Sequence, residues 1–182
     1  TYRVDGVLGF KDKEGHQMVI EYSDTTQYQT VSGDWHTVMA SGPMLVKGGE
    51  IVVPQLMGDG ADGDNIAAML DEQKKGSKIR THYSSAQFYD KRHPRAAVGT
   101  DDEGNIYYVV IDGRFKGQGD GASIYETAYI CHMLGMTEAI NLDGGGSTTL
   151  WTEDTGVINH PYDNKKFDHE GERSVPNLIV AY

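Results

Sequence analysis

A chain of 182 residues is long enough for one domain with a hydrophobic core of its own. Its 27 acidic and 16 basic residues give a net charge of −11, which argues against unspecific nucleic-acid binding, since that requires a basic face. The single cysteine, Cys131, excludes an intrachain disulfide and a cysteine-rich zinc site. No apolar run approaches the roughly 18 residues that a membrane-spanning helix needs.

The first part of the chain alternates apolar and polar residues between charged turns, a pattern typical of β-strands. Strands are predicted at residues 4–10, 17–22, 36–46 and 51–53. The third of these contains Ser41-Gly42-Pro43. Because proline cannot donate a hydrogen bond to a neighbouring strand, we expect an edge, a bulge or a bend at this point.

Two features of the next segment have local explanations. Residues 58–65, GDGADGDN, resemble a calcium-binding loop in composition but lack the ligand order of an EF-hand, so a flexible acidic loop is the default interpretation. Residues 66–75, IAAMLDEQKK, have apolar side chains at helical spacing and precede Gly76. They predict a short amphipathic helix with a glycine at its C-terminal cap.

The second half of the chain predicts a hairpin followed by a helix. Pro94 favours an extended chain leading into a strand at 96–98, a turn is expected at DDEGN (101–105), and the apolar run Ile106–Ile111 is the return strand. Ser123 and Glu126 have the spacing of a capping box, which predicts a helix over residues 124–134 that ends at Gly135.

The most informative stretch is AINLDGGGSTTLW at residues 139–151. Its apolar start predicts a buried strand ending near Leu142, then a backbone loop, then a second strand from about Thr148. Glycines let a loop bring backbone N–H groups close to a ligand, and successive N–H groups form a concave anion site. A hairpin turn without function is the alternative. No GKS or GKT follows, and a strand rather than a helix is expected next, so neither nucleotide-binding fingerprint fits.

The C-terminal part is a long polar segment that ends in a predicted strand at 178–181. The predicted elements together indicate an α+β fold: a mixed, largely antiparallel sheet with two principal helices packed on it. We find no internal repeat and no linker, so residues 1–182 are expected to form a single domain.

Four motifs, in order along the chain, resemble the phosphodiester glycosidase family. They are RHPRAAVG (92–99), VVIDGR (109–114), NLDGGGSTTL (141–150) and GERSVPN (171–177), and the resemblance covers about residues 38–182. It implies a hydrolase of carbohydrate metabolism located outside the cytoplasm, whether secreted, periplasmic or anchored at the cell surface.

The sequence departs from the family pattern at two places. Ala96 stands where the family commonly has threonine, so one hydroxyl near the expected phosphate contact is absent. The family also usually has an upstream Asn-Gly segment ending in aromatic residues, which is not found here. We therefore expect the domain to lack an upstream segment that helps to build the site.

A sugar-1-phosphodiester would be the substrate class that this resemblance implies. Its leaving group is a phosphate monoester with a second pKa near 6, so little help from a general acid is needed, but positive charge around the phosphate is. Arg95 and Arg114 are the first candidates to bind it, because guanidinium groups are permanently charged and bidentate, and Arg92 and Arg173 are the second. The amides at 144–147 would add a neutral anion cradle.

The sugar side requires a carboxylate that stabilises the oxocarbenium ion, attacks it or activates water. Asp143 is the first candidate and Asp112 the second, while Glu126 is weaker because its capping role already explains it. Further candidates to contact the sugar or the phosphate are Asn141, Gly144, Gly145, Gly146, Ser147, Thr148, Ser41, Gly42 and His93. His160 is a second candidate base or ligand.

Nothing in the sequence requires a cofactor, since HExxH and other tight histidine pairs are absent, but a divalent cation bridging Asp143 and the phosphate is kept as an alternative. The expected partner is a phosphorylated glycan or sugar-1-phosphodiester, with no nucleic acid and no transmembrane segment. Three functions stay open: a phosphodiester glycosidase, a non-catalytic module that binds phosphorylated glycans, and a calcium-dependent interaction domain that uses residues 58–65.

Overall fold

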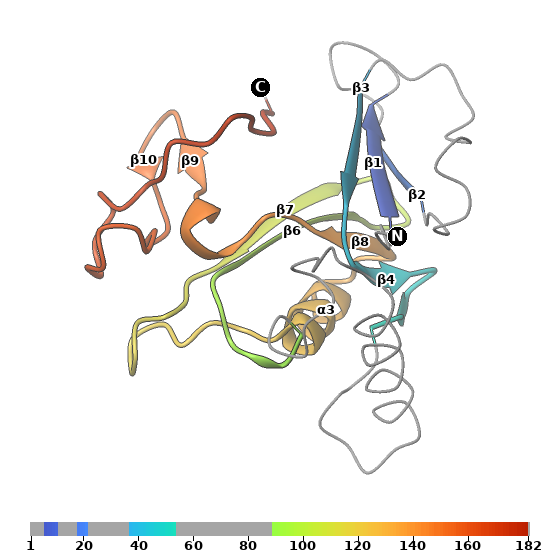
Figure 1. The fold of residues 1–182 in the computed structure, drawn as a ribbon. Helices are drawn as coiled ribbons and strands as arrows, with labels where there is room; N and C mark the ends of the chain where they lie inside the picture. The colour runs from blue at the N-terminus through green and yellow to red at the C-terminus, as the bar shows by residue number, and fades with distance from the viewer. Residues whose placement is uncertain (1–5, 11–17, 22–36, 54–88, 182) are drawn as a thin grey trace, which may run out of the picture.

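The central sheet of the protein has five antiparallel strands in the order β5–β4–β8–β6–β7 (Figure 1). The structure is a computed structural model that describes residues 6–10, 18–21, 37–53 and 89–181. The strands are β4 (Met44–Lys47), β5 (Glu50–Ile51), β6 (Arg95–Thr100), β7 (Ile106–Ile111) and β8 (Glu138–Asn141). The predicted turn at 101–105 joins β6 to β7.

A second sheet contains the N-terminal strands in the order β2–β1–β3. Its members are β1 (Gly6–Phe10), β2 (Met18–Glu21) and β3 (Thr37–Ser41), so the strands predicted for this part of the chain are confirmed. The predicted interruption at Pro43 is confirmed as well. β3 ends at Ser41, the Gly42–Pro43 peptide bond is cis, and β4 begins at Met44 in the other sheet.

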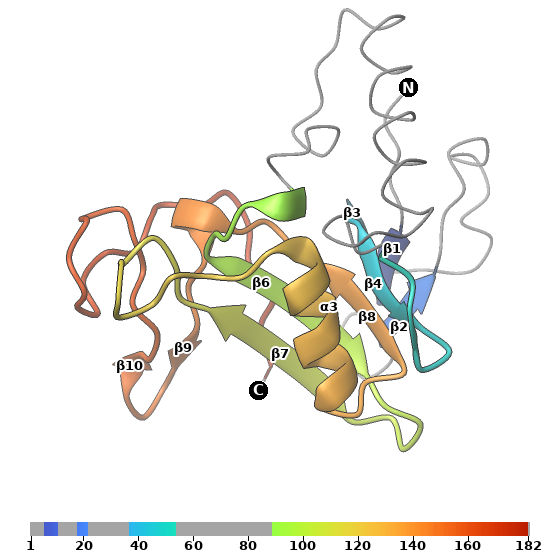
Figure 2. The same ribbon diagram turned by 90° about the horizontal axis from the view of Figure 1, so that it is seen from below.

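Helix α3 (Ile124–Met133) lies across one face of the central sheet, as Figure 2 shows. Its capping box forms as the sequence predicts: the Glu126 N–H donates to Ser123 Oγ at 3.1 Å, and the Ser123 N–H donates to Glu126 Oε2 at 2.8 Å. Gly135 follows the helix with a φ of 85°, a left-handed conformation that favours glycine. None of the described helices is long and apolar enough to cross a membrane.

Side chains that point to opposite faces of the strands build a core on both sides of the central sheet, and an irregularity in β4 places the consecutive residues Leu45 and Val46 in the same cluster. On the face toward α3, the buried residues are Leu45, Val46, Ala97 and Ala139 from the sheet and Ile124, Ala128 and Cys131 from the helix. The neighbouring strand residues Met44, Val98 and Ile140 are buried on the other face, where Met39 of β3 packs against them. The second sheet and α3 therefore cover opposite faces.

The α+β architecture is confirmed, although the strand after the glycine loop differs from its prediction. Only α3 exceeds one helical turn among the described residues, and both the predicted helix at 66–75 and the acidic loop at 58–65 lie outside those residues. The loop predicted after Leu142 contains a 3₁₀ turn, η2 (Gly145–Ser147), and no strand begins at Thr148 as predicted. The next strand, β9 (Trp151–Thr152), begins later and pairs only with β10 (Gly156–Val157).

The strand predicted at 178–181 is also wrong, since these residues join no sheet. Leu178 and Val180 are 72% and 58% exposed, whereas Ile179 packs against the Met44, Val98 and Ile140 cluster. The packing of Ile179 explains one apolar residue of this segment, but no strand pairing accompanies it. Alternation alone does not reveal whether a neighbouring strand has a free edge.

Candidate active site

The register of the central sheet brings three of the predicted motifs to one end of the sheet. Arg95 at the start of β6 is paired with Ile111 at the end of β7, and Ala97 is paired with Asn141 at the end of β8. The segments that continue from these strands, residues 92–94, 112–114 and 142–147, therefore meet. The candidate residues Asp112 and Arg114 directly follow the Ile106–Ile111 strand, so they lie at this end of the sheet.

The glycine loop, residues 143–147, is held tightly against the chain before β6. The Gly145 N–H donates to the Pro94 carbonyl at 2.9 Å, and a Cβ on Gly144 would lie 2.7 Å from the same oxygen. The Ser147 N–H donates to the Gly144 carbonyl at 3.1 Å. Two of the four amides proposed for an anion cradle thus have partners within the protein, which reduces the share that backbone amides can take in binding an anion.

Arg114 is the arginine that lies against this loop. Its Nη2 atom is 3.2 Å from the position that a Cβ on Gly145 would take. The guanidinium group also lies over the ring of Tyr162, 5.2 Å from its centre, and Nε is 3.4 Å from His93 Nδ1. Arg114 is exposed and has a φ of 67°, an uncommon value for a residue with a side chain. Such strained backbone occurs preferentially at functional sites.

The other three candidate arginines are engaged elsewhere. Arg95 is only 2% exposed, and it donates from Nε to the Ala122 carbonyl and from Nη2 to the Lys91 carbonyl, both at 2.9 Å. Burial, with a smaller contribution from the charge of Arg114, lowers the pKa of Arg95 to about 10. Arg92 pairs with Glu126. Of the four arginines, Arg114 is the one that is exposed and forms no ion pair with a described residue.

Arg173 forms a bidentate pair with Asp163, through distances of 2.6 Å from Nε to Oδ2 and 2.7 Å from Nη2 to Oδ1. This pair packs directly on the glycine loop, because a Cβ on Gly146 would overlap both side chains. The carboxylate of Asp163 raises the pKa of Arg173, with a smaller contribution from Asp143. The pair is therefore part of the same charged cluster as the loop.

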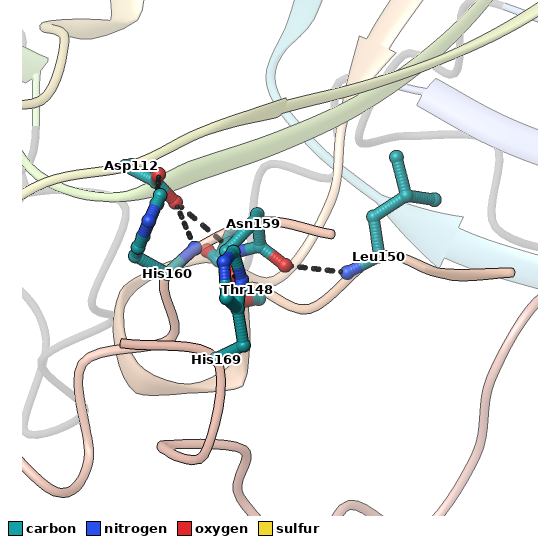
Figure 3. A network of polar contacts seen from close by, with 6 residues as sticks. All are labelled: Asp112, Thr148, Leu150, Asn159, His160 and His169. Atoms are coloured by element: carbon teal, nitrogen blue, oxygen red, sulfur yellow. Dashed lines mark hydrogen bonds and ion pairs between the residues drawn. The ribbon is translucent and has the colours of Figure 1, made fainter. Parts of the chain in front are cut away.

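The three candidate carboxylates differ in how many hydrogen bonds they already accept. Asp112 accepts three: from the His160 N–H at 2.9 Å, from Asn159 Nδ2 at 3.1 Å and from His160 Nδ1 at 2.7 Å (Figure 3). Glu126 is bound by the Ser123 N–H and by Arg92. Asp143 is exposed and accepts no hydrogen bond from any described residue. Asp143 is thus the carboxylate that stays available to a ligand.

Asn141, at the end of β8, links the residues that lead into the glycine loop to the bend before β4. Its Nδ2 donates to the carbonyls of Gly42 at 3.1 Å and Leu142 at 2.8 Å, and Ser41 Oγ donates to the Asn141 carbonyl at 2.6 Å. Asn141 Oδ1 and Thr148 Oγ1 are both buried without a hydrogen-bond partner. Because buried polar atoms are normally paired, these two are candidates to contact a ligand.

Some features of the site escape sequence analysis. Tyr162 and Asp163 come to the loop from a polar segment that has no periodicity to suggest a role.

A cavity of about 420 Å³ lies beside the start of α3, lined by Arg92, Glu126 and mainly apolar residues, and shares no residue with the glycine loop. No group of three or more histidine, cysteine or acidic side chains that could hold a metal ion occurs in the described part of the chain.

Comparison with known proteins adds three relatives. Mouse N-acetylglucosamine-1-phosphodiester alpha-N-acetylglucosaminidase is 33% identical over 81 residues, which are 44% of this chain and 15% of the mouse protein. The catalytic domain of the zebrafish enzyme of that name, solved in a form auto-inhibited by its pro-peptide, matches with a TM-score of 0.60 at 22% identity, over 92% of this chain and 50% of its own. A putative exported protein of Burkholderia pseudomallei is 40% identical over 44% of this chain and 15% of its own, with a TM-score of 0.39.

The chain therefore spans half or less of the length of each of these relatives. The match to the zebrafish catalytic domain shows a similar fold and nothing more. The sequence model of the phosphodiester glycosidase family, in contrast, matches residues 1–182, and the chain belongs to this family.

Proposed function

We propose that the protein is a hydrolase that cleaves the glycosidic bond of a sugar-1-phosphodiester and releases a free sugar and a phosphomonoester. Family membership supports a hydrolase of this kind. The observation that carries the proposal is the position of Arg114, whose exposed guanidinium lies against Gly145 with no ion pair to a described residue. A planar cation placed in this way suits the bidentate binding of a phosphate.

Asp143 is the proposed reacting carboxylate. It is exposed at the start of the glycine loop and close enough to Arg173 to affect the pKa of that side chain. A phosphate bound by Arg114 at Gly145 would be two residues away from Asp143 along the loop. This arrangement would set the phosphate leaving group beside a carboxylate that can stabilise the sugar cation, attack it or activate water.

Charge and leaving group together explain why one free carboxylate can suffice. A phosphomonoester has a second pKa near 6, far below that of a sugar alcohol, so it departs with little need for a proton. Arg114 would stabilise the charge that develops on the leaving phosphate. Asp112 and Glu126 already accept hydrogen bonds from other residues, and this is compatible with the chemistry because neither carboxylate is required as a general acid.

A non-catalytic module that binds phosphorylated glycans is the second candidate, and one observation favours it. Most glycosidases use two carboxylates. Of the three predicted here, only Asp143 accepts no hydrogen bond from a described residue. A binding module would need Arg114 and the loop but not Asp143.

The wider setting of the activity is part of the same proposal. We take residues 1–182 as one catalytic domain of a protein that acts outside the cytoplasm, in accordance with the family and with a relative described as a putative exported protein. The name of the mouse relative suggests an N-acetylglucosamine-1-phosphodiester as the first substrate to test.

The deciding experiment measures reducing sugar released from an N-acetylglucosamine-1-phosphodiester by the wild type and by Asp143→Asn. We expect release by the wild type and at least a hundredfold loss in the variant, because a reacting carboxylate typically contributes about 10² or more to the rate. Asp102→Asn is the matched control, since Asp102 is an exposed aspartate in the turn at the other end of β6 and β7.

Three outcomes would contradict the proposal in different ways. Release of sugar phosphate in place of free sugar would mean cleavage on the other side of the phosphorus atom, and hence a phosphodiesterase. Binding of the sugar phosphate without turnover would favour the binding module. Unfolding of Asp143→Asn, measured by circular dichroism, would assign the residue to the stability of the turn.

A further inference from the structure

His160 is held in one tautomer by Asp112. The Asp112 Oδ2 atom is 2.7 Å from His160 Nδ1, and because a carboxylate only accepts, Nδ1 carries the proton. Asp112 Oδ1 also accepts from the backbone N–H of His160 at 2.9 Å, so the residue is anchored at two points (Figure 3). The Nε2 atom of the neutral ring is then left with its lone pair.

His169 is held in the same way by a different acceptor. Its Nδ1 atom is 2.8 Å from the Asn159 carbonyl oxygen, which also only accepts, so Nε2 again keeps the lone pair. No hydrogen bond joins either Nε2 to any of the residues that the structure describes. The two ring centres are 4.5 Å apart.

This arrangement has the features that metal-binding histidines share. Such histidines nearly always donate their second ring N–H to a carboxylate or a backbone carbonyl, which orients the ring and raises the basicity of the ligating nitrogen. His160 uses a carboxylate and His169 a carbonyl. Zn–N bonds of about 2 Å at a tetrahedral angle set two ligating imidazole rings with their centres roughly 5 Å apart. The ring centres of His160 and His169 are 4.5 Å apart, close to this separation, and the ring planes are inclined by 32°.

Phe167 completes the environment of the pair. Its ring stacks on that of His160 with centres 3.8 Å apart and planes inclined by 6°, which restricts rotation of the imidazole. His160 is partly buried whereas His169 is exposed, so an ion could reach the pair from solvent.

We infer that His160 and His169 form a two-histidine site for a divalent transition-metal ion such as Zn²⁺, Ni²⁺ or Cu²⁺. Imidazole nitrogen suits these ions better than Mg²⁺ or Ca²⁺, which prefer oxygen. The other coordination positions would be taken by water or by an anionic oxygen of a ligand. The inference does not depend on the proposed hydrolase activity, because it rests on the geometry of the two histidines alone.

The test is a calorimetric titration of the metal-stripped protein with Zn²⁺ or Ni²⁺ alone, supported by the absorption spectrum of bound Co²⁺. We expect one ion per chain, and at least tenfold weaker binding for both His160→Asn and His169→Asn. Asparagine is chosen because its amide can replace the Nδ1–H donor to Asp112 or to Asn159 while it removes the Nε2 ligand.

His132→Asn is the matched control. The Nδ1 atom of His132 also lies 3.0 Å from a backbone carbonyl, that of Gly49, but His132 lies on α3, and its ring stacks on no other histidine ring of the described residues. The affinity of His132→Asn for Zn²⁺ or Ni²⁺ should equal that of the wild type. The inference is overturned if millimolar Zn²⁺ and Ni²⁺ do not bind, if both variants bind like the wild type, or if His132→Asn weakens binding as strongly. Should His160→Asn not fold, His169→Asn decides, because its exposed ring is bonded only to backbone.

Discussion

The functional differences between the arginines lie in their individual partners. All four candidates have the same side chain, yet Arg95 is bound by two carbonyls, Arg92 by Glu126 and Arg173 by Asp163. A guanidinium already occupied in this way would have to give up a hydrogen bond in order to bind a ligand. Arg114, held over Tyr162, would lose much less.

At this scale we predict that Arg114→Lys weakens the binding of sugar phosphates by about tenfold, because one charge-assisted hydrogen bond of the bidentate pair is lost. Binding of the free sugar should not change. Isothermal titration with both ligands measures the difference. Arg92→Lys serves as the control, since Arg92 is already paired with Glu126. Equal affinities of wild type and Arg114→Lys for the sugar phosphate would remove Arg114 from the site.

Elements of the fold depend on a few residues at their ends. Helix α3 begins at the capping box of Ser123 and Glu126, which satisfies two N–H groups that the first turn would leave unpaired. The glycine loop shows the opposite case. Thr148 and Thr149, which follow this loop, favour a strand locally, but the loop is anchored by the bond from the Gly145 N–H to the Pro94 carbonyl, and the next strand begins only at Trp151.

For the helix, we expect Ser123→Ala to lower the free energy of unfolding by about 1 kcal/mol, because the acceptor for the Glu126 N–H is removed. Chemical denaturation followed by circular dichroism measures this. An equal loss in Ser174→Ala, which changes an exposed serine outside the helix, would show that the effect is not due to the cap.

On the scale of the whole molecule, stability comes from a sheet whose two faces are both covered. Cys131 can be used to follow the packing of the helix on the sheet, because its thiol is fully buried between α3 and the sheet. Burial raises the pKa of the Cys131 thiol to about 12, so the reactive thiolate is scarce at neutral pH. Reaction of the thiol therefore requires the helix to separate from the sheet.

We accordingly predict that a thiol reagent labels the native protein only through unfolding, and that Ser123→Ala increases the labelling rate by about fivefold, in proportion to its effect on stability. Since Cys131 is the single cysteine, mass spectrometry follows one site. Labelling of the native protein at the rate of the chain in denaturant would show that the helix opens independently of the remaining core.

The sequence by itself determined the local elements and the family. Most of the strands and the helix follow from apolar spacing over two to four residues, and the capping box and the bend at Pro43 were predicted from residues close in sequence. The four motifs indicated a phosphodiester glycosidase, which the family match confirms. These features could be predicted because the interactions behind them are short-range.

The tertiary structure decided which of the candidate side chains remain available. Asp112 is occupied by His160, 48 residues away in sequence, and Arg92 by Glu126, 34 residues away. Partners at such separations meet only when β6, β7 and β8 pair in register, so no local pattern contains them. The position of Arg114 on the glycine loop, and the pairing of His160 with His169, arise from the same long-range packing.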